Sequence, residues 1–205
     1  MSTNNTLALL PVMEHFYTIQ GEGYYQGRAA YFVRLGGCDV GCPWCDVKES
    51  WDADIHPKMS VAEIVAVVKE TGAKICVITG GEPLMYDLNA LTISLKNEKI
   101  RAHVETSGAY VARGNFDWVT VSPKRYKLPL ESNLLLASEL KVVINHVNDF
   151  RWAENFAPQV NADCKLYLAP EWEQEEELMP RIIDYVKENQ QWEISLQIHK
   201  YINVP

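Results

Sequence analysis

Ser60-Val-Ala-Glu-Ile-Val-Ala-Val-Val-Lys-Glu-Thr71 leads, two residues later, into Lys74-Ile-Cys-Val-Ile-Thr79 and the turn Gly80-Gly-Glu-Pro83. The first run carries apolar residues at helical spacing, and Ser60 with Glu63 predicts a capping box at its start. The second run is short, apolar and β-rich, which is typical of a buried strand. A helix followed at once by a buried strand indicates one unit of a parallel α/β sheet.

The same alternation extends over most of the chain. Further β-rich runs cover 30–35, 101–105, 118–121, 139–145, 165–168 and 192–198, and helical spacing recurs over 87–97 and 179–189. Another helix is expected to begin at Asn148 or Asp149 and to include Trp152 and Phe156. Strands that alternate with helices form parallel sheets with right-handed crossovers. A closed eight-unit barrel needs about 250 residues. Because this chain has 205, we predict an α/β fold with a partial, open TIM-type barrel and a parallel sheet, formed by a single domain over residues 1–205.

Composition limits the classes of function. The net charge of −8 argues against broad binding to nucleic acid, which needs a basic surface. No apolar run is long enough to cross a membrane. The apolar stretch 7–10 has no basic segment before it, so we do not expect a secretory signal. Three of the five cysteines lie within eight positions, which favours a metal site over a disulfide framework. We expect a cytoplasmic protein without a nucleic-acid or membrane partner.

The clustered cysteines form the run Cys38-Asp-Val-Gly-Cys42-Pro-Trp-Cys45. Thiolates are the usual ligands of iron–sulfur clusters, and this spacing lets one loop hold three corners of a cube. Cys76 lies inside an apolar run and Cys164 lies far along the chain, so both are expected to be core residues. One iron is therefore left open for a cofactor or substrate. A zinc site and three unrelated buried thiols are the alternatives.

The residues of chemical interest follow successive predicted strands. Cys38 follows the first β-rich run, Gly80-Gly-Glu-Pro83 the second, Thr106-Ser-Gly108 the third and Ser122-Pro-Lys124 the fourth. In parallel sheets, ligands bind in the loops after the carboxyl ends of the strands. We therefore expect these four loops to form one site.

The cysteine spacing, with the glycine-rich turn one strand later, resembles the radical S-adenosylmethionine superfamily. This resemblance implies a [4Fe–4S] cluster held by Cys38, Cys42 and Cys45, with S-adenosylmethionine on the open iron. It implies that the cofactor is bound by residues of three loops: Trp44, Cys45, Asp46, Gly80, Gly81, Glu82, Ser122, Pro123 and Lys124. Glu82 would accept a hydrogen bond from the methionyl ammonium group.

Other segments resemble one family within that superfamily, the 7-carboxy-7-deazaguanine synthases of queuosine precursor synthesis. They are Phe16-Tyr-Thr-Ile-Gln-Gly-Glu-Gly23, Glu105-Thr-Ser-Gly108 and Ser195-Leu-Gln-Ile-His-Lys-Tyr201. The resemblance runs from about residue 14 to 205. It implies a lyase that converts 6-carboxy-5,6,7,8-tetrahydropterin to 7-carboxy-7-deazaguanine with loss of ammonia, after a 5′-deoxyadenosyl radical takes the C6 hydrogen. It also implies a homodimer, with flavodoxin or ferredoxin as electron donor.

The resemblance also implies a set of substrate-binding residues. Arg34 would approach the substrate carboxylate, which suits a planar bidentate donor. Glu22 would face the guanidine-like edge of the pterin, with a hairpin-turn role as its alternative. Lys141 could be the cationic partner of the cofactor in place of Lys124; its alternative is a lysine on an edge strand. The full set is Ile19, Gln20, Gly21, Glu22, Arg34, Thr79, His199 and Pro205, the last two in a tail that closes over the substrate.

One position departs from the family. Many members have threonine two residues after the third cysteine, and its hydroxyl ligates Mg²⁺ beside the substrate carboxylate. Here the run is Cys45-Asp-Val-Lys48, and valine has no oxygen for a hard cation, so an Mg²⁺ cofactor is in doubt. We hypothesise that Lys48 or a neighbouring cation takes over part of its electrostatic role; a solvated Lys48 is the alternative.

Two other functions fit parts of the sequence. A glycyl-radical-type activating enzyme also uses a three-cysteine loop, but it acts on a protein backbone. A non-catalytic module would hold zinc on the three cysteines and, for example, His56, or would hold iron and sulfur alone. The segments 19–23 and 197–200 favour the enzyme that acts on a small molecule.

Overall fold

The helix–strand unit that opens the sequence argument is α1 (Val61–Glu70) followed by β4 (Ile75–Gly80). Ser60 Oγ accepts a hydrogen bond from the Glu63 amide at 3.3 Å, and the Glu63 carboxylate accepts one from the Ser60 amide at 2.7 Å. The predicted capping box is therefore confirmed. It satisfies two of the amide groups that the first turn of a helix leaves without partners.

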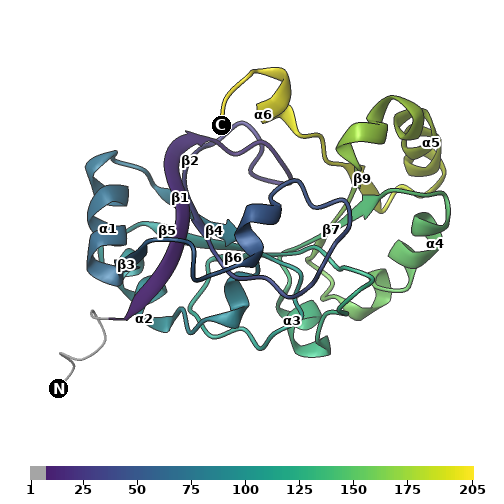
Figure 1. Ribbon diagram of the computed structural model, residues 1–205. Coiled ribbons are helices and arrows are strands. Elements are labelled where there is room, and N and C mark those ends of the chain that lie inside the picture. Colours follow the sequence, from purple (N-terminus) through teal and green to yellow (C-terminus); the bar gives the residue numbers. More distant parts are fainter. Residues whose placement is uncertain (1–7) are drawn as a thin grey trace.

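The computed structural model describes residues 8–205, which form one nine-stranded sheet in the order β3-β1-β2-β4-β5-β6-β7-β8-β9 (Figure 1). The start of the chain, which entered the argument about a secretory signal, lies largely outside these residues. The other strands are β1 (Leu9–Ile19), β2 (Ala29–Leu35), β3 (Lys58–Ser60), β5 (Arg101–Thr106), β6 (Trp118–Val121), β7 (Glu139–Ile144), β8 (Lys165–Pro170) and β9 (Trp192–Ile194).

Helices α1 to α5 lie around the outside of the curved sheet (Figure 1). Those not yet given are α2 (Asn89–Asn97), α3 (Glu131–Leu136), α4 (Asn148–Glu154) and α5 (Glu175–Glu188). The short helix α6 (Ile198–Tyr201) lies in the C-terminal tail, and the 3₁₀ turns are η1 (Lys48–Trp51), η2 (Pro83–Met85), η3 (Ala157–Gln159) and η4 (Trp172–Gln174). The predicted α/β architecture, an open partial barrel, is confirmed. No helix within residues 8–205 is long and apolar enough to span a membrane.

The predicted parallel sheet is confirmed for β2 and β4 to β9. Two strands that were not predicted extend it, because β1 pairs antiparallel with both β2 and β3. One strand prediction is corrected. The run 192–198 is not one strand: β9 ends at Ile194, and Ile198 already begins α6. The chain turns away there because the Ser195 hydroxyl accepts a hydrogen bond from the Gly23 amide at 2.9 Å and the Ile198 amide donates to the Gly21 carbonyl at 3.0 Å. These bonds draw the tail toward the loop between β1 and β2.

Side chains on β2 and β4 alternate between the two faces of the sheet. Tyr31, Val33 and Leu35 belong to the core under the helices, whereas Ala30 and Phe32 pack inside the barrel with Ile75 and Val77 of β4. This is the two-residue period of a strand. The next inward positions toward the carboxyl ends of these strands are Arg34 on β2 and Thr79 on β4. Both line the cavity.

Aromatic side chains close the barrel below that point. The Tyr25 ring lies 4.5 Å from the His103 ring and 5.0 Å from the Trp118 ring, measured between centroids. Tyr24 stacks on Trp118 at 5.1 Å. The lower end of the barrel is thus packed, and the carboxyl ends of the strands are left as the open end.

Candidate active site

A cavity of about 280 Å³ opens at the carboxyl ends of the strands. The structure brings together in its lining all but one of the residues predicted from sequence to form the site. They are Ile19, Gln20, Gly21, Glu22, Arg34, Cys38, Cys42, Trp44, Cys45, Asp46, Thr79, Gly80, Gly81, Glu82, Ser122, Lys124, His199 and Pro205. Pro123 is buried and does not line it.

The three clustered cysteines lie on one side of this cavity. The Cys45 amide donates to the Cys42 carbonyl at 3.1 Å, and the Cys38 amide donates to the Trp51 carbonyl at 3.1 Å, which fixes the loop at two points. Burial raises the pKa of the Cys38 and Cys42 thiols, and the nearby Lys124 ammonium opposes this rise at Cys42. The lysine thus favours the thiolate form that a metal requires.

The donor set fits an iron–sulfur cluster with one open iron. Cys76 is fully buried in β4, where burial raises its pKa to about 12, and is a core residue as predicted. Cys164 is partly buried at the edge of the core, and neither cysteine lines the cavity. The imidazole of His56, named as a possible fourth zinc ligand, contacts the Glu49 carbonyl at 2.8 Å and also lies outside the cavity lining. Among residues 8–205, no three His, Cys, Asp or Glu side chains are grouped to hold a single metal ion. Three soft thiols alone match a [4Fe–4S] cluster that keeps one coordination site for another ligand.

The glycine-rich turn packs directly on the base of the cysteine loop. The Gly81 amide donates to the Leu35 carbonyl at 2.8 Å, and the Glu82 amide donates to the Gly37 carbonyl at 2.8 Å. Gly80 has a φ of 113°, a region that favours glycine,. A Cβ atom at Gly81 would overlap the carbonyl oxygen of Gly37. Glycine therefore allows this backbone to reach the cluster loop and the cavity together.

Glu82 holds this turn to the next loop. Its side chain is buried, with 1% of the residue exposed. The carboxylate accepts hydrogen bonds from the Leu84 amide at 3.0 Å, the Ser107 amide at 2.8 Å, and the Thr106 and Ser107 hydroxyls. These four donors occupy the usual acceptor positions of a carboxylate. A direct bond from Glu82 to the methionyl ammonium would have to replace one of them.

Lys124 lies beside the cysteine loop in the cavity lining. Its ammonium donates to the Ser122 carbonyl at 2.9 Å and to the Ser122 hydroxyl at 2.7 Å, and it lies 5.6 Å from the centre of the Trp44 ring. Burial lowers the pKa of Lys124 to about 8. Lys48, by contrast, is exposed at the start of η1 and does not line the cavity, although Val47 does. The position of Lys48 favours the solvated alternative.

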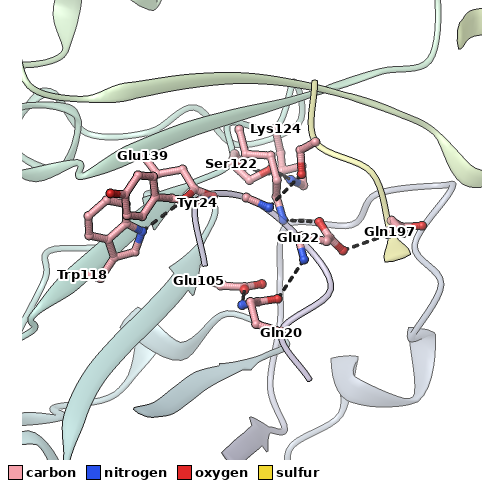
Figure 2. Close-up of polar contacts among 12 residues, drawn as sticks. Gln20, Glu22, Tyr24, Glu105, Trp118, Ser122, Lys124, Glu139 and Gln197 are labelled. Atoms are coloured by element: carbon pink, nitrogen blue, oxygen red, sulfur yellow. Dashed lines mark hydrogen bonds and ion pairs between the residues drawn. The ribbon is translucent and has the colours of Figure 1, made fainter. Parts of the chain in front are cut away.

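The opposite side of the cavity carries a polar network (Figure 2). The Gln20 amide donates to Glu105 Oε1 at 2.8 Å, and Gln20 Oε1 accepts from the Glu22 amide at 3.1 Å. Glu22 contacts the Lys141 ammonium and accepts from Gln197 Nε2 at 3.0 Å. Arg34 Nε is buried without a hydrogen bond and lies 3.2 Å from Glu14 Oε1. The Arg34 guanidinium therefore lines the cavity while it is paired with a carboxylate from the neighbouring strand β1.

The C-terminal tail crosses this side of the cavity. Besides the Ile198–Gly21 bond, the Thr18 hydroxyl donates to the Pro205 carbonyl at 3.1 Å. His199 packs so closely on Gly21 that a Cβ atom there would overlap its ring. Burial lowers the pKa of His199. A side chain at position 21 would push the tail away from the cavity.

Several residues that line the cavity could not be recognised as site residues from the sequence patterns. Glu105, Thr120 and Lys141 were not assigned to the substrate, yet all three line it. Their strands read as buried runs, and only strand alternation from Arg34 and Thr79 could have placed them on the inner face. Gln197 was quoted only as part of the tail.

Known proteins resemble this chain over nearly its whole length. Residues 32–132 match the radical SAM superfamily model. The 7-carboxy-7-deazaguanine synthase of Flavobacterium psychrophilum is 53% identical over 197 residues, which are 96% of this chain and 93% of that protein. The synthase of the same name from Synechocystis is 50% identical over 194 residues, 95% of this chain and 93% of that protein. The crystal structure of QueE from Escherichia coli superposes with a TM-score of 0.86 at 31% identity and covers 96% of this chain and 99% of that one.

The contact between Gly81 and Gly37 gives a test of the site geometry. Gly81→Ala should displace the cysteine loop, because the added methyl overlaps the Gly37 carbonyl. We expect lower iron and sulfide content after reconstitution and slower reductive cleavage of S-adenosylmethionine. Gly27→Ala controls for a strained glycine substitution away from the cavity, since Gly27 has a φ of 83°, which disfavours alanine, but no atom lies within 4 Å of its added Cβ and it does not line the cavity. Equal cluster content and cleavage in the wild type and both variants would contradict this account of the turn.

Proposed function

The chain belongs to the 7-carboxy-7-deazaguanine synthase family of radical S-adenosylmethionine enzymes. We propose that it converts 6-carboxy-5,6,7,8-tetrahydropterin to 7-carboxy-7-deazaguanine, with loss of ammonia, in this cavity. One observation carries the proposal. Three cysteines, the glycine-rich turn and a row of inward polar side chains from successive strands line a single cavity. A [4Fe–4S] cluster and S-adenosylmethionine, which family membership implies, supply the carbon-centred radical that removes the C6 hydrogen. The chain's own residues bind, orient and shield the reactants.

The cluster side of the cavity supplies the cofactor ligands. Cys38, Cys42 and Cys45 would each ligate one of three irons in the cluster. The backbone of Gly80 and Gly81 approaches the methionyl group closely because neither residue has a side chain. Lys124, held against Ser122 and Trp44, places a positive charge for the cofactor carboxylate. We propose further cofactor contacts for Trp44 and Asp46, which line the cavity, and a supporting role in the same loop as Lys124 for the buried Pro123.

The opposite side supplies the pterin ligands. Arg34 pairs with the substrate carboxylate, because its planar guanidinium lines the cavity and can form two parallel charge-assisted bonds,. Gln20 offers an amide with both donor and acceptor atoms. Glu22 and Glu105 accept from the N–H groups of the aminopyrimidinone edge. Ile19, Gly21, Thr79, His199 and Pro205 shape the remaining walls, and the tail shields the reaction from water.

The remaining partners are proposals that rest on the family resemblance. A one-electron donor must reduce the cluster, and flavodoxin or ferredoxin suits that role. We propose a homodimer and a cytoplasmic location. Residues 1–205 are proposed to act as a single domain, which is supported by the one sheet that runs through the described residues.

The proposed function is tested by product formation. Reconstituted protein is incubated with a reductant, S-adenosylmethionine and 6-carboxytetrahydropterin, and the deazaguanine product and ammonia are measured by mass spectrometry and an ammonia assay. We expect both in equal amounts. Their absence, in protein with an intact cluster that still cleaves S-adenosylmethionine, would sink the substrate assignment and favour an activating enzyme for a protein substrate.

A second prediction concerns magnesium. Val47 lines the cavity where many relatives have a threonine ligand, and its side chain offers no oxygen to Mg²⁺,. We propose that this enzyme does not require the ion. Activity of metal-stripped, cluster-intact protein should stay nearly constant as Mg²⁺ is added, whereas Val47→Thr should gain a magnesium response. A steep magnesium activation of the unmodified protein would show that the proposal is wrong.

A further inference from the structure

Lys141 is a lysine enclosed within the barrel. It lies on β7, and only 7% of the residue is exposed. Its ammonium contacts the Oε2 atom of Glu22, while Gln197 Nε2 holds the other oxygen, Oε1, at 3.0 Å. Both oxygens of Glu22 therefore have fixed partners, one from β7 and one from the C-terminal tail. Figure 2 shows Glu22 beside Gln197 in this network.

Several other charged groups face this pair from the surrounding elements. Glu105 on β5 and Glu139 on β7 both act on Lys141 at a distance, and His199 on the tail and Lys124 after β6 complete the surroundings. Glu105 accepts from Gln20, and Glu139 accepts from the Tyr24 amide at 3.0 Å and from Trp118 Nε1 at 3.3 Å. Within residues 8–205, Glu22 is the one carboxylate in ion-pair contact with Lys141.

The pair controls the charge of Glu22. Burial raises the pKa of this carboxyl group, but the Lys141 ammonium, together with the hydrogen bond from Gln197 and the charge of His199, outweighs burial and holds the pKa below its ordinary value. Glu139, which has no ion-pair partner among residues 8–205, shows the contrast: burial raises its pKa to about 7. An ionised carboxylate only accepts hydrogen bonds, whereas a protonated one presents a donor to the ligand.

We propose that Lys141 is a positioning residue for the reaction: it holds Glu22 as an ionised acceptor, in a fixed orientation, for the N–H edge of the pterin. This inference rests on the proposed function, because it requires Glu22 to face the substrate. Lys141 itself need not touch the pterin. The edge-strand role expected as one alternative for Lys141 is excluded by its burial on β7, which has β6 and β8 on its two sides.

The test follows the Michaelis constant for the pterin as a function of pH. In Lys141→Met, Glu22 loses its cation and its pKa rises toward neutrality, so KM should climb on the acidic side by about tenfold per pH unit. In the wild type KM should not show this added rise. The kcat at saturating pterin should change little, because the variant loses an interaction that binds the pterin equally well in the ground state and in the transition state. Lys69→Met is the matched control, since it removes an exposed lysine paired with Glu98 at 2.7 Å.

Two further variants separate this role from a purely structural one. If Lys141→Met does not fold, Lys141→Gln keeps a hydrogen-bond donor but removes the charge, and it should show the same KM profile. In a Glu22→Gln background, Lys141→Met should add no pH dependence, because position 22 no longer titrates. A KM profile parallel to the wild type in both lysine variants would overturn the inference. A wild-type protein that neither binds nor converts the pterin would overturn the proposed function itself.

Discussion

The alternation of side chains along parallel strands is the constraint on which the site depends. Successive residues of a strand point to opposite faces, so Phe32 and Arg34 share the inner face of β2 while Tyr31 and Val33 join the helix-covered core. Apolar and aromatic residues fill the lower part of the barrel. Polar residues at the next inward positions then meet at its open end, where the loops carry the cysteines and glycines. The same alternation of side chains therefore determines which residues fill the barrel and which polar residues line the cavity.

Two carboxylates, the buried Glu82 and the half-buried Glu22, have different environments in this interior. Glu82 is surrounded by four neutral donors and joins the loops after β4 and β5. Glu22 is paired with a cation and a single amide, and it remains beside the cavity. A buried charge is costly unless it is paired or fully hydrogen-bonded. The partners of Glu82 fix the backbone of two loops, whereas the partners of Glu22 keep its charge available to a ligand.

Much of the fold and of the candidate site could be predicted from sequence, because local patterns of residues indicate them. Buried parallel strands read as apolar runs, and Cys38, Cys42 and Cys45 lie close in the chain. The antiparallel strand β1 was missed because polar residues such as Glu14 and His15 interrupt its pattern. Lys141 was ambiguous and Glu105 was missed because their importance comes from pairing across strands. Lys48 was considered because it lies near the cysteines in sequence, but it does not line the cavity, whereas Lys124, predicted from the loop after the fourth strand, does.

The central claim is that cofactor and pterin react within one cavity, and hydrogen transfer tests it most directly. The enzyme is supplied with pterin deuterated at C6, and deuterium is followed by mass spectrometry into the 5′ position of S-adenosylmethionine and of 5′-deoxyadenosine. The account predicts that the label appears there as the deazaguanine forms. Turnover with no deuterium in either molecule would contradict it, because the radical would then be quenched elsewhere.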